Sequence, residues 1–230
     1  AKKLLEKASA SGISENGLIK LEEKLNARSN QELLYLYNKG SYEIALSKGL
    51  ALAKGNPQDP DVFNILGAIY TALEKYGEAI VKYQKAIKLN PTNAQFHNNL
   101  GATFSKMGRL DDAINSYREA IRLKPDYAEA YSNLGDAFFK NGDFEDAKAE
   151  FLRCLEIDNA YPEAHRNIAA IKERNGDFIG ALFDLKRAID LRNSFSEAYY
   201  KFGLIFERLE FTENILDFDD IIITLLKDKS

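Results

Sequence analysis

A single pattern of residues recurs every 34 positions along most of this 230-residue chain, and its spacing never slips by a residue. The six copies, numbered here repeats 1 to 6, begin at residues 26, 60, 94, 128, 162 and 196. Repeat 2 shows the pattern as Phe63, Leu66, Gly67, Tyr70, Ala79, Tyr83, Ala86 and Pro91. A period of roughly 20–50 residues is typical of stacked supersecondary units, because one such unit cannot bury its apolar face alone. The chain is therefore expected to be a repeat protein.

The positions within each repeat predict two helices. Apolar residues at repeat positions 4, 7, 8 and 11 follow the spacing of one helix face, and a second apolar or small set stands at positions 17, 20, 24, 27 and 30. Position 15, between the two sets, is glycine in four repeats: Gly40, Gly108, Gly142 and Gly176. Glycine tolerates the left-handed conformation that ends a helix. Proline at position 32 stops the second helix in three repeats, as Pro57, Pro91 and Pro125. The sequence therefore predicts an all-α fold.

This pattern resembles the tetratricopeptide repeat (TPR) family over about residues 26–215, in its period and in its glycine, alanine and proline positions. The resemblance implies a right-handed α-α superhelical solenoid of about six helix-turn-helix repeats. Histidine or tyrosine replaces the family's usual tryptophan at position 4, and Asn159 and Asn193 replace proline. The expected domains are an N-terminal helical cap over residues 1–27, the solenoid over 28–211 and a C-terminal capping helix over 212–230.

The two ends of the chain do not follow the period. Residues 4–8 predict one short amphipathic helix and residues 18–25 another, with Gly12 and Gly17 as breaks between them, and both are expected to pack on repeat 1. The last segment is more apolar than the polar face that ends most solenoids, with Ile215, Leu216, Phe218, Ile221, Ile222, Ile223, Leu225 and Leu226. We expect a truncated capping helix, or less readily a truncated strand, that docks on a missing domain or on another copy of the chain.

Three successive repeats carry asparagine at position 6: Asn99, Asn133 and Asn167. Positions 2, 6, 9 and 13 fall on the side of the first helix opposite its apolar face, and the TPR resemblance places this side in a concave, peptide-binding groove. An asparagine amide offers both a donor and an acceptor, so this column is expected to hold the backbone of an extended peptide. It resembles the asparagine ladder of the TPR arm of protein O-GlcNAc transferase-like bacterial proteins. Alternatively, the asparagines are exposed repeat residues that serve no ligand.

A column of basic residues follows at position 13: Lys106, Lys140, Arg174 and Arg208. It lies two turns along the same helix face as the asparagines, so we expect it to attract acidic side chains of the peptide. A purely structural explanation is also open, because a cation in the last turn of a helix offsets the helix dipole by about 0.3–1 kcal/mol.

One TPR subclass is excluded by the sequence. Adaptors for chaperone tails hold a terminal carboxylate with a clamp that includes lysine and asparagine at positions 5 and 9. The corresponding pairs here are Asn30/Leu34, Asn64/Ala68 and Asn98/Ala102. The lysine–asparagine pair is missing, so this clamp is not expected.

We find no residue that predicts catalysis or metal binding. His97 and His165 stand two periods apart at position 4, where an aromatic packing residue belongs, and Cys154 replaces the small alanine of position 27. A D-x-D sequence at residues 217–220 matches metal-dependent glycosyltransferases, but an acidic face on the final helix explains it better. The sequence also carries no P-loop, dinucleotide-binding or zinc-protease motif. We therefore expect no catalytic residue, no metal and no cofactor.

The composition excludes several kinds of partner. A net charge of −4 and an isoelectric point near 5.4 leave no basic excess to neutralise nucleic-acid phosphates. No apolar run in the sequence approaches the roughly 20 residues that cross a bilayer, so membrane insertion is not expected. The single cysteine fits a reducing compartment, and we expect a cytoplasmic location.

The sequence therefore predicts a protein-interaction scaffold that binds an extended peptide segment in its concave groove. Two alternatives stay open. The chain resembles the substrate-recruiting arm of a larger glycosyl-, sulfo- or methyltransferase, whose catalytic domain would lie beyond Ser230. Alternatively, it is a self-assembling scaffold in which the apolar C-terminal helix of one copy fills the groove of another.

Overall fold

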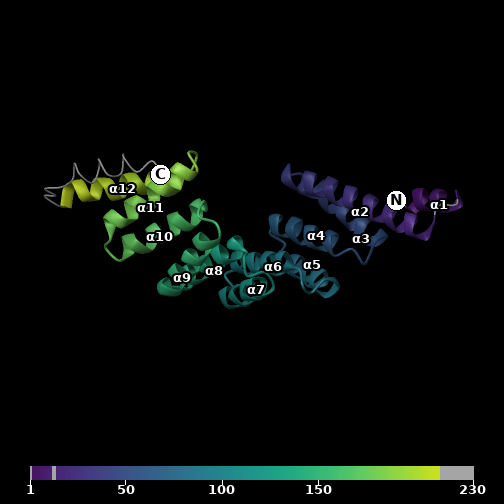
Figure 1. The fold of residues 1–230 in the computed structure, drawn as a ribbon, viewed down its shortest axis with the longest axis horizontal. Helices are drawn as coiled ribbons and strands as arrows, with labels where there is room; N and C mark the ends of the chain where they lie inside the picture. The colour runs from purple at the N-terminus through teal and green to yellow at the C-terminus, as the bar shows by residue number, and fades with distance from the viewer. Residues whose placement is uncertain (1, 12–13, 213–230) are drawn as a thin grey trace. The chain divides into compact units, whose positions relative to one another are not determined.

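The computed structural model describes residues 2–11 and 14–212, in which helices follow one another through short turns (Figure 1). Their bounds are α1 Lys2–Ala10, α2 Glu15–Asn38, α3 Tyr42–Gly55, α4 Pro60–Ala72, α5 Tyr76–Leu89, α6 Ala94–Lys106, α7 Leu110–Leu123, α8 Ala128–Asn141, α9 Phe144–Ile157, α10 Pro162–Arg174, α11 Phe178–Leu191 and α12 Ser196–Thr212. These described residues contain no strand, and the predicted all-α fold is confirmed.

The first helices of repeats 2 to 6 begin at the first residue of each repeat, at Pro60, Ala94, Ala128, Pro162 and Ser196. Two of these starts have side-chain caps: Asp59 accepts hydrogen bonds from the backbone of α4, and Asn93 accepts one from the backbone of α6. Such caps satisfy N–H groups that have no partner inside the helix. The 34-residue period therefore predicts the helix starts residue by residue.

The turn between the two helices of a repeat has a left-handed residue at position 15. Gly40, Gly108, Gly142 and Gly176 have φ angles of 73°, 73°, 92° and 82°. Repeat 2 has Glu74 at this position, with φ at 59°. A residue with a Cβ is strained in this conformation by about 1–2 kcal/mol, so the turn geometry is imposed by the packing of the two helices and not by glycine alone.

In repeats 2 and 4, the two helices approach closely at the glycine of position 8. A Cβ built on Gly67 would lie 2.6 Å from Cε1 of Tyr83, and one built on Gly135 would lie 2.7 Å from Cε1 of Phe151. Both aromatic rings stand at position 24 and are almost fully buried. The small residue therefore makes room for the ring that fills the space between the helices, as the repeat pattern predicts.

The chain divides into two compact units, Ala1–Met107 and Gly108–Ser230. The N-terminal unit has a core that includes Val62, Leu66 and Phe96. The C-terminal unit has a core that includes Leu182 and Ile205. No helix in the described part of the chain is long and apolar enough to span a membrane.

The expected N-terminal boundary does not coincide with a helix end. The predicted short helix over residues 18–25 is instead part of α2, which runs without interruption through residue 27 and forms the first helix of repeat 1. Gly17 does not break the chain, because it lies in the first turn of α2 and donates its N–H to the Ser14 hydroxyl, 3.3 Å away. A glycine near the start of a helix is part of its cap and not its end.

The last described helix is longer than the first helices of repeats 2 to 5. α12 has 17 residues, whereas α4, α6 and α10 each have 13 and α8 has 14. Repeat 6 has Glu210 at the turn position, and α12 continues past it to Thr212. The predictions made for the apolar segment after Thr212, including the capping helix, the self-association surface and the D-x-D sequence, lie outside the described residues.

Candidate functional site

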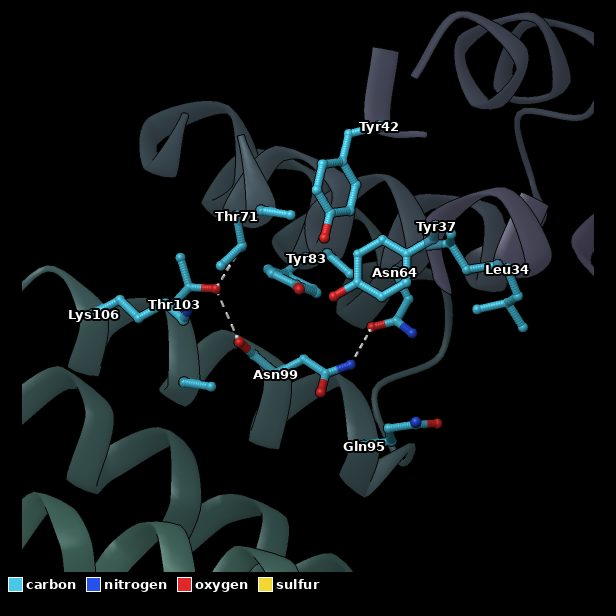
Figure 2. Close-up of a pocket in the computed structure, with 14 residues that line it drawn as sticks. Leu34, Tyr37, Tyr42, Asn64, Thr71, Tyr83, Gln95, Asn99, Thr103 and Lys106 are labelled. Atoms are coloured by element: carbon cyan, nitrogen blue, oxygen red, sulfur yellow. Dashed lines mark hydrogen bonds between the residues drawn. The ribbon is translucent and has the colours of Figure 1, made fainter. Parts of the chain in front are cut away.

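The N-terminal unit contains a pocket of about 550 Å³, called here the neutral pocket (Figure 2). Its lining comes from α2, α4, α5, α6 and the first residue of α3, and consists of Leu34, Tyr37, Tyr42, Asn64, Ile65, Ala68, Thr71, Ala72, Tyr83, Gln95, Asn99, Ala102, Thr103 and Lys106. Of these described residues, Lys106 alone is charged. Two predicted site residues, Asn99 and Lys106, therefore line a pocket that is otherwise uncharged.

Asn99 is paired with a second asparagine in this pocket. Its Nδ2 donates to Oδ1 of Asn64, 2.9 Å away, as the dashed line in Figure 2 marks. Both side chains are half-buried. The pairing fixes the orientation of both amides, and it uses neither the side-chain carbonyl of Asn99 nor the N–H groups of Asn64. Sequence reasoning considered Asn64 only as part of an absent carboxylate clamp and missed this role.

Three hydroxyl groups meet deeper in the neutral pocket. The hydroxyls of Thr71 and Thr103 are 2.9 Å apart, and each also lies within hydrogen-bonding distance of a carbonyl in its own helix. Both interact with the hydroxyl of Tyr83, whose pKa is raised to about 12 because burial outweighs these hydrogen bonds. The cluster therefore stays protonated and uncharged at neutral pH. The 34-residue period does not reveal it, because the two threonines stand 32 residues apart.

The C-terminal unit contains a wider pocket of about 810 Å³, called here the arginine pocket. Its lining includes three predicted site residues from successive repeats: Lys140, Arg174 and Arg208. The remaining lining is Phe139, Phe144, Ala170, Glu173, Gly176, Phe178 and Lys201. The side chains at position 13 of repeats 4, 5 and 6 therefore line one pocket.

Both arginines of this pocket lie over phenylalanine rings. The guanidinium carbon of Arg174 is 4.1 Å from the ring centre of Phe144, and that of Arg208 is 4.5 Å from the ring centre of Phe178. Each ring is the first residue of the second helix in the preceding repeat. A cation over a ring is attracted by the negative π face, so the stacking holds each guanidinium in place. The sequence contains a signal for this arrangement, because arginine at position 13 and phenylalanine at position 17 both recur.

A smaller pocket of about 280 Å³ adjoins Asn167 in the same unit. The charged side chains around it form ion pairs at 2.6 Å for Lys140–Asp136, 2.7 Å for Arg166–Glu197 and 3.4 Å for Lys201–Glu173. Asn167 is only 9% exposed. The predicted ladder residue is therefore part of a buried pocket wall, not an exposed position of the repeat.

The third predicted asparagine, Asn133, is half-buried in α8 and is not among the residues that line these three pockets. The asparagine column is thus divided between the units, with Asn99 in the N-terminal unit and Asn133 and Asn167 in the C-terminal unit. The basic column is divided in the same way, with Lys106 in the N-terminal unit.

The histidines and the cysteine have structural contacts. Nε2 of His97 lies 3.2 Å from the carbonyl oxygen of Pro91, and Nε2 of His165 lies 3.4 Å from that of Asn159. Both carbonyls stand at position 32 of the preceding repeat, so the histidines tie one repeat to the next. Cys154 is fully buried, and burial raises the pKa of its thiol to about 12, which disfavours the reactive thiolate.

The sequence profile of the TPR repeat matches residues 67–108, 103–142 and 135–176. The chain contains tetratricopeptide repeats. This identification agrees with the helix pairs, turn glycines and repeat starts described above. No curated protein sequence matches the chain.

Solved TPR structures share the fold. A thermophilic TPR protein of Thermus thermophilus is 19% identical, with 78% of this chain and 98% of that one covered and a TM-score of 0.66. YrrB, described as a TPR protein with an unusual peptide-binding site, is 21% identical, with 79% and 94% covered and a TM-score of 0.57. The first TPR of Spaghetti (RPAP3), solved with the HSP90 peptide SRMEEVD, is 28% identical, with 52% and 94% covered and a TM-score of 0.50. The chain therefore has the fold of a TPR solenoid.

Proposed function

We propose that this TPR scaffold binds an extended acidic peptide, and that the arginine pocket of the C-terminal unit selects its acidic side chains. The observation that carries this proposal is the pair of arginines stacked on phenylalanine rings, Arg174 on Phe144 and Arg208 on Phe178. Both side chains line the same pocket.

Stacking prepares a guanidinium for a carboxylate. The ring covers one face of the guanidinium and restricts its rotamers, while the N–H groups at its edge stay in the plane where a carboxylate is bound in a bidentate manner. Less side-chain entropy is then lost when the peptide binds. Lysine lacks this planar fork, so the two arginines are expected to contribute more than Lys140.

The charge around the pocket favours an anion. Its lining contains four basic side chains, Lys140, Arg174, Lys201 and Arg208, against one acidic side chain, Glu173. Two of the four form ion pairs, Lys140 with Asp136 and Lys201 with Glu173, so the proposal rests on the two stacked arginines. Helix dipoles explain part of this column, since Lys140 and Arg174 lie in the last turns of their helices. Arg208 does not lie in the last turn of α12, so the dipole does not account for it.

The asparagines have a supporting role in this proposal. Asn99, Asn133 and Asn167 hold peptide backbone through their amides, independently of the peptide's sequence. A neutral hydrogen bond contributes only about 0.5–1.5 kcal/mol net, so three of them do not give tight binding without the charged contacts. We expect a dissociation constant on the order of micromolar.

Two structural neighbours support peptide binding. The RPAP3 structure holds the peptide SRMEEVD, which contains three acidic residues, and YrrB is described as having a peptide-binding site. The lysine–asparagine clamp pairs are missing from this chain. We therefore propose recognition of acidic side chains along the peptide, and not of its terminal carboxylate. The proposed location remains the cytoplasm.

The test is a titration of the chain with a short glutamate-rich peptide whose terminal carboxylate is amidated. Replacement of both stacked arginines, Arg174→Gln with Arg208→Gln, should weaken binding by at least about tenfold, or about 1.4 kcal/mol. The control is Arg122→Gln with Arg153→Gln, which removes the same charge from two exposed arginines that pair with Glu119 and Glu156. Equal losses in the two variants would show that net charge, and not the arginine pocket, governs binding.

A further inference from the structure

We infer that the neutral pocket of the N-terminal unit is a separate binding site for an uncharged aromatic side chain, tyrosine or tryptophan. This inference rests on the proposed function in one respect, which is that the aromatic group is taken to be part of a peptide. The site itself is lined entirely by residues of the N-terminal unit.

The neutral pocket is open because small alanine side chains stand at positions 9 and 13 where the helices line it. Position 9 is Ala68 in repeat 2 and Ala102 in repeat 3, and position 13 of repeat 2 is Ala72, where later repeats have a cation. All three alanines are half-buried and line the cavity. Its volume of about 550 Å³ is enough for an aromatic side chain with part of its flanking backbone.

The lining disfavours a charged occupant. No acidic side chain is among the described residues that line the pocket, and Lys106 is exposed. A buried charge without a partner loses its hydration and gains nothing in return. The protonated Tyr83 cluster adds no charge either. An acidic group is favoured only at Lys106, and the remainder of the pocket favours an uncharged group.

The same lining favours an aromatic group over an aliphatic one. The rings of Tyr37 and Tyr42 have their centres 5.7 Å apart at an angle of 55°, and Figure 2 shows both hydroxyls directed toward the ring of Tyr83. A third ring inserted beside this pair can contact a ring edge or face, which aromatic pairs prefer. Burial raises the pKa of Tyr37, so its hydroxyl stays protonated as a donor.

The asparagine pair supplies the polar contacts that a tyrosine or tryptophan needs. Asn64 and Asn99 are fixed by their mutual hydrogen bond, with donor and acceptor groups left for a ligand. Phenol O–H and indole N–H groups require such a partner when they are buried. Leucine or isoleucine would leave these amide groups without a partner, at a cost in affinity.

The experiment uses N-acetyltryptophanamide as the probe. The chain contains no tryptophan, so the fluorescence anisotropy of the probe reports its binding without background from the protein. N-acetyltyrosinamide should displace the probe at a concentration at least about tenfold lower than N-acetylleucinamide requires. Failure of the probe to bind, or equal displacement by the leucine compound, would overturn the inference.

Variants locate the site. Ala68→Leu fills the neutral pocket from α4 and should weaken probe binding by at least about tenfold, and Ala102→Leu should do the same from α6. Ala170→Leu is the matched control, because it makes the same change at position 9 of repeat 5 and lines the arginine pocket instead. Circular dichroism checks that each variant is folded. Unchanged probe binding in folded Ala68→Leu and Ala102→Leu, or a loss in Ala170→Leu alone, would refute the site.

The two proposals fail separately. A glutamate-rich peptide without aromatic residues should bind Ala68→Leu with little change, since the arginine pocket is untouched and Asn99 makes only a supporting contact to this peptide. If the probe binds but this peptide does not, the acidic-peptide function is wrong and the aromatic site stands. If the peptide binds but the probe does not, the aromatic site is wrong and the acidic-peptide function stands.

Discussion

The two units use the same repeat positions to build pockets of opposite character. In the N-terminal unit, position 13 is Ala72 in repeat 2 and Lys106 in repeat 3, and the pocket that both line is otherwise uncharged. In the C-terminal unit, position 13 is Lys140, Arg174 or Arg208, and the pocket is basic and aromatic. The repeat framework is the same in both, so the difference shows that a few substitutions at fixed positions change the charge and the lining of a pocket.

The framework that the two units share should be the most sensitive feature. Gly135→Leu in the C-terminal unit and Gly67→Leu in the N-terminal unit each force a side chain into an aromatic ring less than 3 Å away. Each should lower the free energy of unfolding by about 1–3 kcal/mol or more, which thermal denaturation would detect as a shift of roughly 2–4 °C per kcal/mol. Gly77→Leu is the control, because nothing lies within 4 Å of a Cβ at that glycine. Unchanged melting of Gly135→Leu would disprove the repeat register.

High pH should lower the free energy of unfolding of the N-terminal unit, because the buried hydroxyl of Tyr83 resists ionisation. Its pKa is raised from 10.0 to about 12 by burial, so it contributes stability below about pH 10 that is lost as the pH rises toward 12. Tyr83→Phe should therefore reduce the loss of stability between about pH 8 and about pH 11, measured by urea unfolding. Tyr161 in the C-terminal unit also has a pKa raised to about 12 by burial, so Tyr161→Phe is the matched comparison. An identical pH dependence with and without the Tyr83 hydroxyl would contradict this account.

The asparagine pair should make Asn99 contribute to stability as well as to binding. Asn99→Ala and Asn64→Ala should each cost about 0.5–1.5 kcal/mol, and the double variant should cost less than their sum, because both remove the same hydrogen bond. Urea unfolding of the two single variants and the double variant measures this coupling. Strict additivity would show that the two amides do not interact in solution.

The turn at position 15 should give the smallest effects, with opposite signs in the two units. Glu74→Gly relieves a left-handed residue in the N-terminal unit and should stabilise it by up to about 1 kcal/mol, reduced by the greater freedom of glycine in the unfolded chain. Gly142→Ala introduces the same strain in the C-terminal unit and should destabilise it by about 1 kcal/mol. Thermal denaturation of both variants tests the difference. A loss of stability in Glu74→Gly would mean that the glutamate side chain makes a contact that outweighs the strain.

The sequence predicts the framework well because the framework repeats. Helix starts such as Pro60 and turn residues such as Gly142 recur at fixed positions, so each copy supports the interpretation of the others. The separate short helix expected over residues 18–25 is wrong, because Gly17 lies before the first repeat, where no second copy shows whether a glycine ends a helix or begins one.

The pockets are harder to predict because they depend on what differs between repeats. The Asn64–Asn99 pair joins position 5 of one repeat to position 6 of the next, and a search at a fixed position does not find it. The cluster of Thr71, Thr103 and Tyr83 also lies outside the shared pattern. The sequence predicts the stacked arginines as cations, and phenylalanine recurs at position 17, but only the packing of one repeat on the preceding one shows that the two groups meet.

The most direct test of the central claim is a binding titration of two matched peptides at low and at high salt. One peptide is rich in glutamate, and the other has glutamine at the same positions, and neither contains an aromatic residue. The account predicts that the glutamate peptide alone binds, that salt weakens its binding because the charges are screened, and that Arg174→Gln with Arg208→Gln abolishes the difference. Equal binding of both peptides, or binding of the glutamate peptide that is unaffected by salt and by loss of both arginines, would contradict it.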